Sequence, residues 1–157
     1  MNTDFVNPFI TATTNILSVM AQIDAKPGTP TVKDSNVSRG DVTGLIGMTG
    51  DKVKGSFSLS FSTAAIADIA EKMLGEKVTS VDETVIDLAG ELVNMATGGA
   101  KQLLEEKEHR FDMATPVVVA GDDHLVVHQS SGPIIILPFT TEAGNFFIEL
   151  SFEDIEK

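Results

Sequence analysis

Residues 55–61 alternate strictly between serine and a large apolar side chain, in the order Gly-Ser-Phe-Ser-Leu-Ser-Phe. Successive side chains of a β-strand point to opposite faces of a sheet, so this alternation predicts a strand with one face in the core. Such a strand needs neighbouring strands on its edges and a second layer over its apolar face. This requirement limits the architectures that the rest of the chain can complete.

The same strand pattern recurs 89 residues further along the chain, as Gly-x-Phe-x-Ile-x-Leu at residues 144–150. A second echo, at an offset of 87, relates residues 4–7 (Asp-Phe-Val-Asn) to residues 91–94 (Glu-Leu-Val-Asn). Two αβ halves related by a pseudo-twofold axis would explain both echoes. Chance similarity between short strand patterns is the alternative.

Apolar spacing and end signals predict three helices. The first follows Asp4 as N-cap and runs over residues 5–23, and the second spans residues 63–74 and ends at Gly75. The third starts near Val81, after a capping box at residues 80–83, and continues to about His109. Strands are expected at about residues 31–35, 42–49, 55–61, 117–120, 125–129, 134–140 and 145–152. The prediction is an α+β fold, with long helices packed on a largely antiparallel sheet in one domain over residues 1–157.

The charge balance excludes several classes of partner. The 157 residues carry 23 acidic and 11 basic side chains, for a formal charge of −12. A nucleic-acid or anionic-membrane partner would require a basic surface, so neither is expected. There is no cysteine, no leading secretory signal and no long apolar stretch, so we expect a cytoplasmic protein.

Two histidines, His124 and His128, have a spacing that could suggest a metal site. In a strand they would lie on one face but about 13 Å apart, which is too far to share one ion. The interpretation is therefore a pair of surface or half-buried strand histidines, and no metal site of this chain is expected.

The predicted helix over residues 85–104 carries an apolar stripe and an opposite polar arc. At about 100° per residue, the polar members fall within roughly 80° of each other. Glu91 and Asn94, three residues apart, are direct neighbours on such a helix. An ordinary solvated face would show the same spacing. The members of the arc are Asp87, Glu91, Asn94, Gly98 and Lys101.

Two features of this arc favour a binding role over a plain solvated face. Asparagine is a poor choice for an exposed helix interior, where Lys, Glu or Gln are more favourable. Gly98 and Gly99 each cost about 1 kcal/mol relative to alanine in a helix. A glycine one turn beyond Asn94 leaves the backbone bare and lets another surface approach closely.

The Asp87-x-x-x-Glu91-x-x-Asn94 arrangement resembles the motif of the CheX/CheC/FliY family of chemotaxis phosphatases, and the likeness is greatest for the CheX-like members. The resemblance extends over nearly the whole chain. It includes the opening Phe-Val-Asn-Pro-Phe, the Gly-x-Phe strand, and the segments that begin at Pro116 and Pro138. It implies a hydrolase that dephosphorylates the aspartyl phosphate of a CheY-like response regulator.

The resemblance also implies roles for the residues of the motif. Glu91 matches the glutamate that anchors on a lysine of the regulator, and Asn94 matches the asparagine that orients the attacking water. Asp87 matches the first motif position, and we assign Asp87 and Gly98 to partner binding. The magnesium ion belongs to the regulator, so this chain requires no cofactor of its own.

Relatives of the CheX type are homodimers, so a homodimer is implied as well. A second centre at Asp4 and Asn7 is not expected, because Pro8 pushes the preceding residue out of the α region. The alternative function is a non-catalytic adaptor that binds a receiver domain or a flagellar-switch partner through the same helix.

Overall fold

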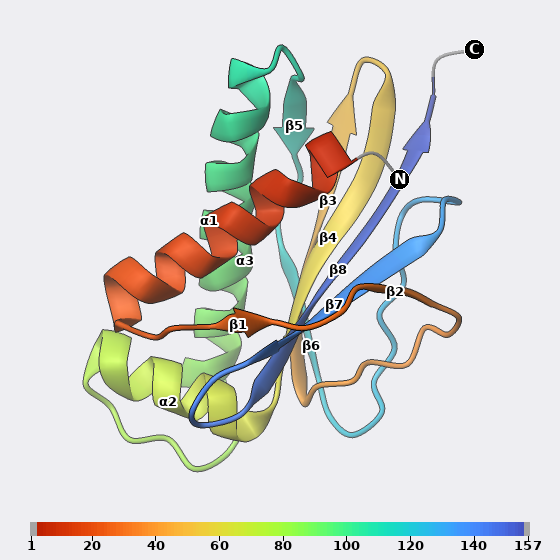
Figure 1. Ribbon diagram of the computed structural model, residues 1–157. Helices are drawn as coiled ribbons and strands as arrows, with labels where there is room; N and C mark the ends of the chain where they lie inside the picture. Colours follow the sequence, from red (N-terminus) through yellow and green to blue (C-terminus); the bar gives the residue numbers. More distant parts are fainter. Residues whose placement is uncertain (1–2, 156–157) are drawn as a thin grey trace.

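The computed structural model describes the backbone of residues 3–155 and the side chains of residues 4–155. Helices α1 (Thr3–Ala21) and α3 (Glu83–Glu106) lie side by side over one face of a sheet, and α2 (Thr63–Leu74) packs at one end (Figure 1). The sheet order is β1-β7-β8-β4-β3-β5, with β2 also on β7 and β6 also on β3, and every pairing is antiparallel. The α+β prediction is therefore confirmed. The strands are β1 (Lys26–Pro27), β2 (Thr31–Lys33), β3 (Val42–Gly50), β4 (Val53–Phe61), β5 (Phe111–Met113), β6 (Val117–Ala120), β7 (Ile134–Thr140) and β8 (Asn145–Asp154).

The predicted internal repeat is visible in the centre of the sheet. Strands β4 and β8 pair directly, and Leu59 lies opposite Ile148. These two positions differ by 89, so they are equivalent under the repeat of the strand pattern. The helices meet in the same way, because a Cβ on Gly99 would lie 3.1 Å from Cβ of Ala12, its equivalent at the offset of 87. Both layers are thus centred on equivalent residues, as a pseudo-twofold axis requires.

The two halves exchange their edge strands. The first half contributes α1 and β1–β4, the second contributes α3 and β5–β8, and α2 connects them. Strands β1 and β2 pair with β7 of the second half, whereas β5 and β6 pair with β3 of the first. Each half therefore completes the sheet of the other, and the two share one hydrophobic core cluster.

Close backbone contacts fix the position of α3 on the other elements. A Cβ on Gly44 of β3 would lie 2.7 Å from the Ala89 carbonyl oxygen and 2.9 Å from the side chain of Val93. A Cβ on Gly90 would lie 3.2 Å from Val118 of β6. The glycines at these positions let the helix backbone lie directly against its neighbours.

The helix ends differ from the prediction in three respects. Helix α3 begins at Glu83, because Asp82 rather than Ser80 is the N-cap and accepts a hydrogen bond from the Val85 amide. Helix α1 begins at Thr3, so Asp4 lies in the first turn and is not the cap. The helix also continues through Pro8. A proline this close to the N-terminus disturbs few intrahelical bonds, so Asn7 stays helical, contrary to the prediction.

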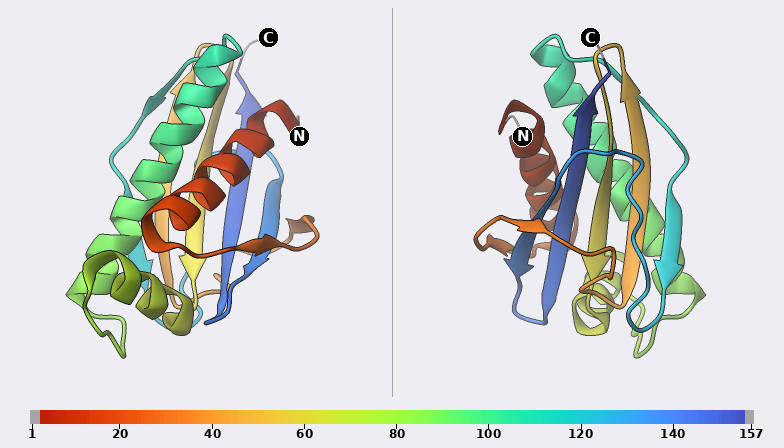
Figure 2. Two further views of the ribbon diagram at one scale, coloured as in Figure 1. Left: turned by 60° about the vertical axis from the view of Figure 1, so that its left-hand side comes forward. Right: turned by 90° about the vertical axis from the view of Figure 1, so that its right-hand side faces the viewer.

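The expected strand over residues 125–129 is absent. That segment belongs to a connection between β6 and β7 that crosses the sheet face opposite the helices, and only Leu125 makes an isolated bridge, to Val37. Figure 2 shows this crossing in its right-hand view. His124 and His128 belong to this connection and are buried, so the prediction of surface or half-buried strand histidines was wrong. Alternation alone could not reveal that a polar sheet face lies beneath this segment.

Replacement of Gly44 by alanine is expected to destabilise the fold by about 1–3 kcal/mol, because the added methyl group meets helix backbone that must shift. Gly47→Ala is the matched control on the opposite face of β3. Its Cβ would have only Ala114 Cβ nearby, at 3.9 Å, so a change within about 0.5 kcal/mol is expected. Denaturant unfolding measures both variants. Equal stabilities would show that α3 does not depend on this contact.

Candidate functional site

The predicted polar arc forms a ridge along α3, which we call the α3 ridge. Asp87, Glu91, Asn94 and Gly98 are exposed on it, and Lys101 is half-buried. The buried residues of the helix lie on the other side, so the carboxylate and the carboxamide stand one helical turn apart on the solvent side. The apolar stripe predicted for this helix, formed by Val85, Leu88, Ala89, Leu92, Ala96, Ala100 and Leu103, is buried apart from Leu103, which is half-buried. Leu104 is buried instead.

Gly98 has no structural explanation among the described residues. Gly90 and Gly99 each pack closely against a neighbouring element, whereas a Cβ on Gly98 would meet no atom within 4 Å. Nor does Gly98 have the positive φ angle that favours glycine. The helix therefore accepts an unfavourable residue at a position where the isolated chain has room for a side chain.

On the buried side of α3, beneath the ridge, the Thr97 hydroxyl forms a hydrogen bond within the helix. Thr97 Oγ1 donates a hydrogen bond to the Val93 carbonyl oxygen at 2.7 Å. This bond uses the carbonyl group that precedes Asn94 and occupies the hydroxyl that would otherwise be unpaired in the core. The hydrogen bond therefore lies on the buried side of the helix, while the Asn94 side chain is on the exposed side.

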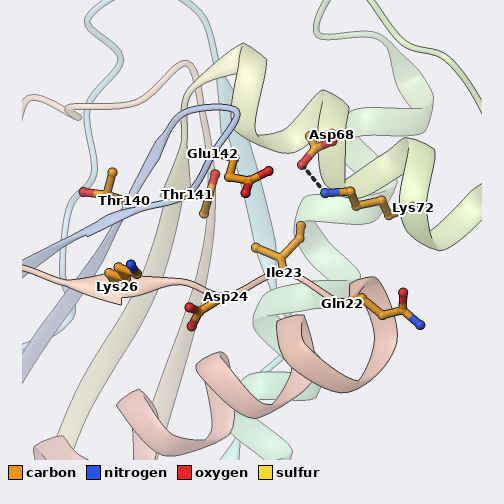
Figure 3. Close-up of a pocket in the computed structure, with 9 residues that line it drawn as sticks. All are labelled: Gln22, Ile23, Asp24, Lys26, Asp68, Lys72, Thr140, Thr141 and Glu142. Atoms are coloured by element: carbon orange, nitrogen blue, oxygen red, sulfur yellow. Dashed lines mark hydrogen bonds and ion pairs between the residues drawn. The ribbon is translucent and has the colours of Figure 1, made fainter.

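The α3 ridge is exposed to solvent, and the main surface hollows of the described residues lie elsewhere. Figure 3 shows a hollow between the end of α1, α2 and the β7–β8 turn, whose wall includes Lys26, Glu142 and the Lys72–Asp68 ion pair at 3.0 Å. Another hollow lies beside the β3–β4 turn and contains Lys107 and Arg110. Neither includes a residue of the α3 ridge, so the candidate site suits insertion into a partner rather than enclosure of a small molecule.

A buried polar cluster on the opposite sheet face was missed by the sequence analysis. Glu149 of β8 is fully buried. Its carboxylate accepts hydrogen bonds from Lys33 Nζ at 2.9 Å and from His128 Nε2 at 3.1 Å. Burial raises the pKa of the Glu149 carboxyl, but the hydrogen bonds from His128 and Lys33 outweigh burial and hold the pKa below its ordinary value. One feature of the sequence could have revealed the cluster. Glu149 lies among apolar residues of a predicted strand, and a carboxylate that is buried in a sheet has to be paired.

The cluster has the composition of a hydrolase triad, because Ser56 Oγ lies 2.5 Å from His128 Nδ1. Ser56 is nevertheless fully buried in a strand, and its hydroxyl oxygen accepts a hydrogen bond from the backbone amide of Gln129. A nucleophile must reach the carbonyl or phosphoryl centre that it attacks, and this one is closed to any substrate. The cluster therefore has a structural role in this conformation.

The echo of the motif on α1 differs from the α3 ridge in detail. Asp4 and Asn7 are both exposed on a continuous helix, so the reason given for excluding them does not hold. The Asp4 carboxylate lies 4.0 Å from Lys107 Nζ, and Thr11 occupies the position equivalent to Gly98. Helix α1 thus carries an aspartate, which is shorter than glutamate, near a lysine side chain. It has no glycine at the position equivalent to Gly98.

None of the helices formed by residues 3–155 combines the length and the hydropathy that crossing a bilayer requires.

Comparison with known proteins gives a consistent result. Residues 42–140 match the family model described as chemotaxis phosphatase CheX. The CheY-P phosphatase CheX of Thermotoga maritima is 31% identical over 142 residues, which cover 89% of each chain. A crystal structure of a CheC-like superfamily protein from Shewanella sp. PV-4 has a TM-score of 0.92 at 52% identity, covering 98% of this chain and 99% of the other.

The crystal structure of a CheX–CheY–BeF3–Mg²⁺ complex from Borrelia burgdorferi matches with a TM-score of 0.80, covering 97% of this chain and 99% of the other. At 21% identity this match shows the shared fold. The family model spans well over half of the sequence and includes the whole α3 ridge. The chain therefore belongs to the chemotaxis phosphatase CheX family.

Proposed function

We propose that this protein hydrolyses the aspartyl phosphate of a CheY-like response regulator. Two relatives support the proposal: one is named a CheY-P phosphatase, and the other forms a complex with CheY. The observation that carries it is the exposure of Glu91 and Asn94 side by side on the solvent-facing side of α3, beside the bare turn at Gly98.

Asn94 would supply the catalytic group. A carboxamide is not a general base, but it offers a donor and an acceptor that together hold a water molecule in a defined orientation. Phosphoryl transfer depends mainly on positioning and charge stabilisation, so such a group can accelerate it. The acyl phosphate, the lysine and the magnesium ion would all belong to the regulator, and this chain would contribute only the inserted side chain.

Glu91 would anchor the ridge in the regulator. A carboxylate paired with a lysine forms a charge-assisted hydrogen bond and fixes how far the helix enters the cleft. Asp87, one turn earlier, would contact the partner at the rim. Gly98, one turn beyond Asn94, would allow the partner's surface to approach the helix backbone. A homodimer, implied by the family resemblance, is part of the proposal, and sedimentation of the purified protein tests it.

Asn94→Ala is expected to slow regulator dephosphorylation by about a hundredfold or more, because water is no longer oriented for attack. The regulator is phosphorylated with acetyl phosphate, and phosphate release is followed with and without the protein. Binding to the beryllofluoride-loaded regulator should persist. Asn7→Ala, at the equivalent exposed position of α1, is the matched control and should retain full activity.

Two outcomes would contradict this assignment. Full activity of Asn94→Ala would leave the adaptor function as the better explanation of the ridge. Loss of activity in Asn7→Ala would show that α1 carries a working centre and that the proposal names the wrong number of sites.

Glu91→Ala is expected to weaken regulator binding by about tenfold or more, since a charge-assisted anchor contributes roughly 1.5–3 kcal/mol. Calorimetry with the beryllofluoride-loaded regulator measures the affinity. Glu105→Ala removes an exposed carboxylate near the far end of the same helix and serves as control. Equal affinity of Glu91→Ala and the unmodified protein would remove Glu91 from the interface.

Replacement of Gly98 separates stability from binding. Gly98→Ala should raise the free energy of unfolding by about 1 kcal/mol, because the methyl group enters open space on a helix. Gly98→Leu should also fold normally yet bind the regulator at least tenfold more weakly, because its side chain would occupy the partner's place. In Gly99→Ala, the control, the methyl group meets Ala12, so the stability gain should be smaller. Undiminished binding by Gly98→Leu would exclude close approach at this turn.

A further inference from the structure

Residues 121–133, which we call the strap, connect β6 to β7 across the sheet face opposite the helices (Figure 2, right). The strap contains no helix or strand of its own. Ordered connections of roughly this length are uncommon in compact domains and often have a function of their own. Nothing in the proposed phosphatase function uses it, since the α3 ridge lies on the other side of the sheet.

The strap buries two histidines and leaves two of its aliphatic side chains exposed, contrary to what their hydrophobicity predicts. His124, Val126 and His128 point inward and are at most 9% exposed, whereas Leu125 and Val127 are 58% and 57% exposed. Val126 is thus the only buried aliphatic side chain of the strap. Hydrophobic burial contributes little to holding the strap in place, because the free-energy gain scales with the apolar area removed from water.

Polar contacts hold the strap instead. At one end, the His124 ring lies 2.6 Å from Thr43 Oγ1 through Nε2 and 2.8 Å from the Gly121 carbonyl oxygen through Nδ1. A carbonyl oxygen can only accept, so Nδ1 carries a proton and donates to the Gly121 carbonyl oxygen. Val126 N donates to the Asn36 carbonyl oxygen at 2.7 Å, and Ser38 N donates to that of His124 at 2.8 Å.

At the other end, a chain of hydrogen bonds leads to Glu149. The Gln129 backbone amide donates to Ser56 Oγ, Ser56 Oγ forms a hydrogen bond with His128 Nδ1, and His128 Nε2 donates to the Glu149 carboxylate. Lys33 completes the set from β2. Lys33 Nζ and His128 Nε2 both donate to the Glu149 carboxylate, so hydrogen bonds at this end of the strap converge on one charged acceptor.

The layer beneath the strap is itself polar. Ser56, Ser58 and Ser60 face it and are fully buried, and the Ser58 hydroxyl has no hydrogen-bond partner among the described residues. Water that entered this layer would satisfy Ser58 and hydrate the other hydroxyl groups. Opening on this side therefore exposes groups that water can solvate, whereas opening on the helix side would expose the aromatic core.

We propose that the strap opens as a unit while the helix-covered core stays folded, and that the Glu149 carboxylate is the latch that holds it closed. The proposal is independent of the phosphatase function and concerns the opposite face of the sheet. It assigns to the fold a second, low-stability unit whose closed state depends on one buried ionic centre.

Native-state hydrogen exchange of the unmodified protein tests the first part. The amides of Val126 and Ser38 report on the strap, and those of Phe57 and Leu59 in β4 report on the core. The strap amides should exchange faster, and their exchange should respond less to low concentrations of denaturant than that of the core amides. A single common denaturant dependence for both sets would overturn the proposal.

Glu149→Gln tests the latch. The neutral amide leaves Lys33 without its counter-charge, so exchange at Val126 and Ser38 should rise by on the order of tenfold or more while β4 and α3 amides keep their rates. Asp154→Asn is the matched control, because Asp154 is an exposed carboxylate at the end of the same strand. Unchanged exchange in Glu149→Gln, or equal acceleration in strap and core, would overturn the assignment of Glu149.

Discussion

The position of α3 on the sheet depends on a backbone contact at Gly44. This glycine lets the Ala89 carbonyl oxygen and the Val93 side chain come closer than any larger residue would permit. Glu91 and Asn94 lie in the turn above that contact, so the buried side of the turn is fixed and its outer side is presented to solvent. The ridge thus combines a rigid support with exposed polar groups, which is the arrangement that precise insertion into a partner would require.

The internal repeat places two similar helices on the sheet, but their exposed surfaces differ. The two halves exchange edge strands and share a core, so the duplication constrains α1 and α3 to equivalent positions. Equivalence of position does not extend to the surface. Helix α1 carries Thr11 where α3 carries Gly98, and its carboxylate is the shorter Asp4, close to Lys107. The fold preserves two similar helices, while the side chains that a partner would contact differ.

Most of the architecture could be predicted because its signals are local. The alternation in residues 55–61 and the apolar period of α3 each report a single buried face. The failures have a different origin. His124 and His128 are buried because a segment distant in sequence crosses a polar sheet face, and no periodicity contains that information. At Pro8 the local rule was applied too strictly, because the first turns of a helix tolerate proline. The roles of Asp87, Glu91, Asn94 and Gly98 stay predictions.

The charge of the protein bears on how such a ridge could find its partner. A formal charge of −12 gives no long-range attraction to an acidic partner, so association with such a partner cannot rely on electrostatic steering. Affinity would then have to come from short-range contacts that form only on insertion, such as a Glu91–lysine pair and close packing at Gly98. Both are contacts that a phosphorylation cleft with a lysine and a metal ion can provide.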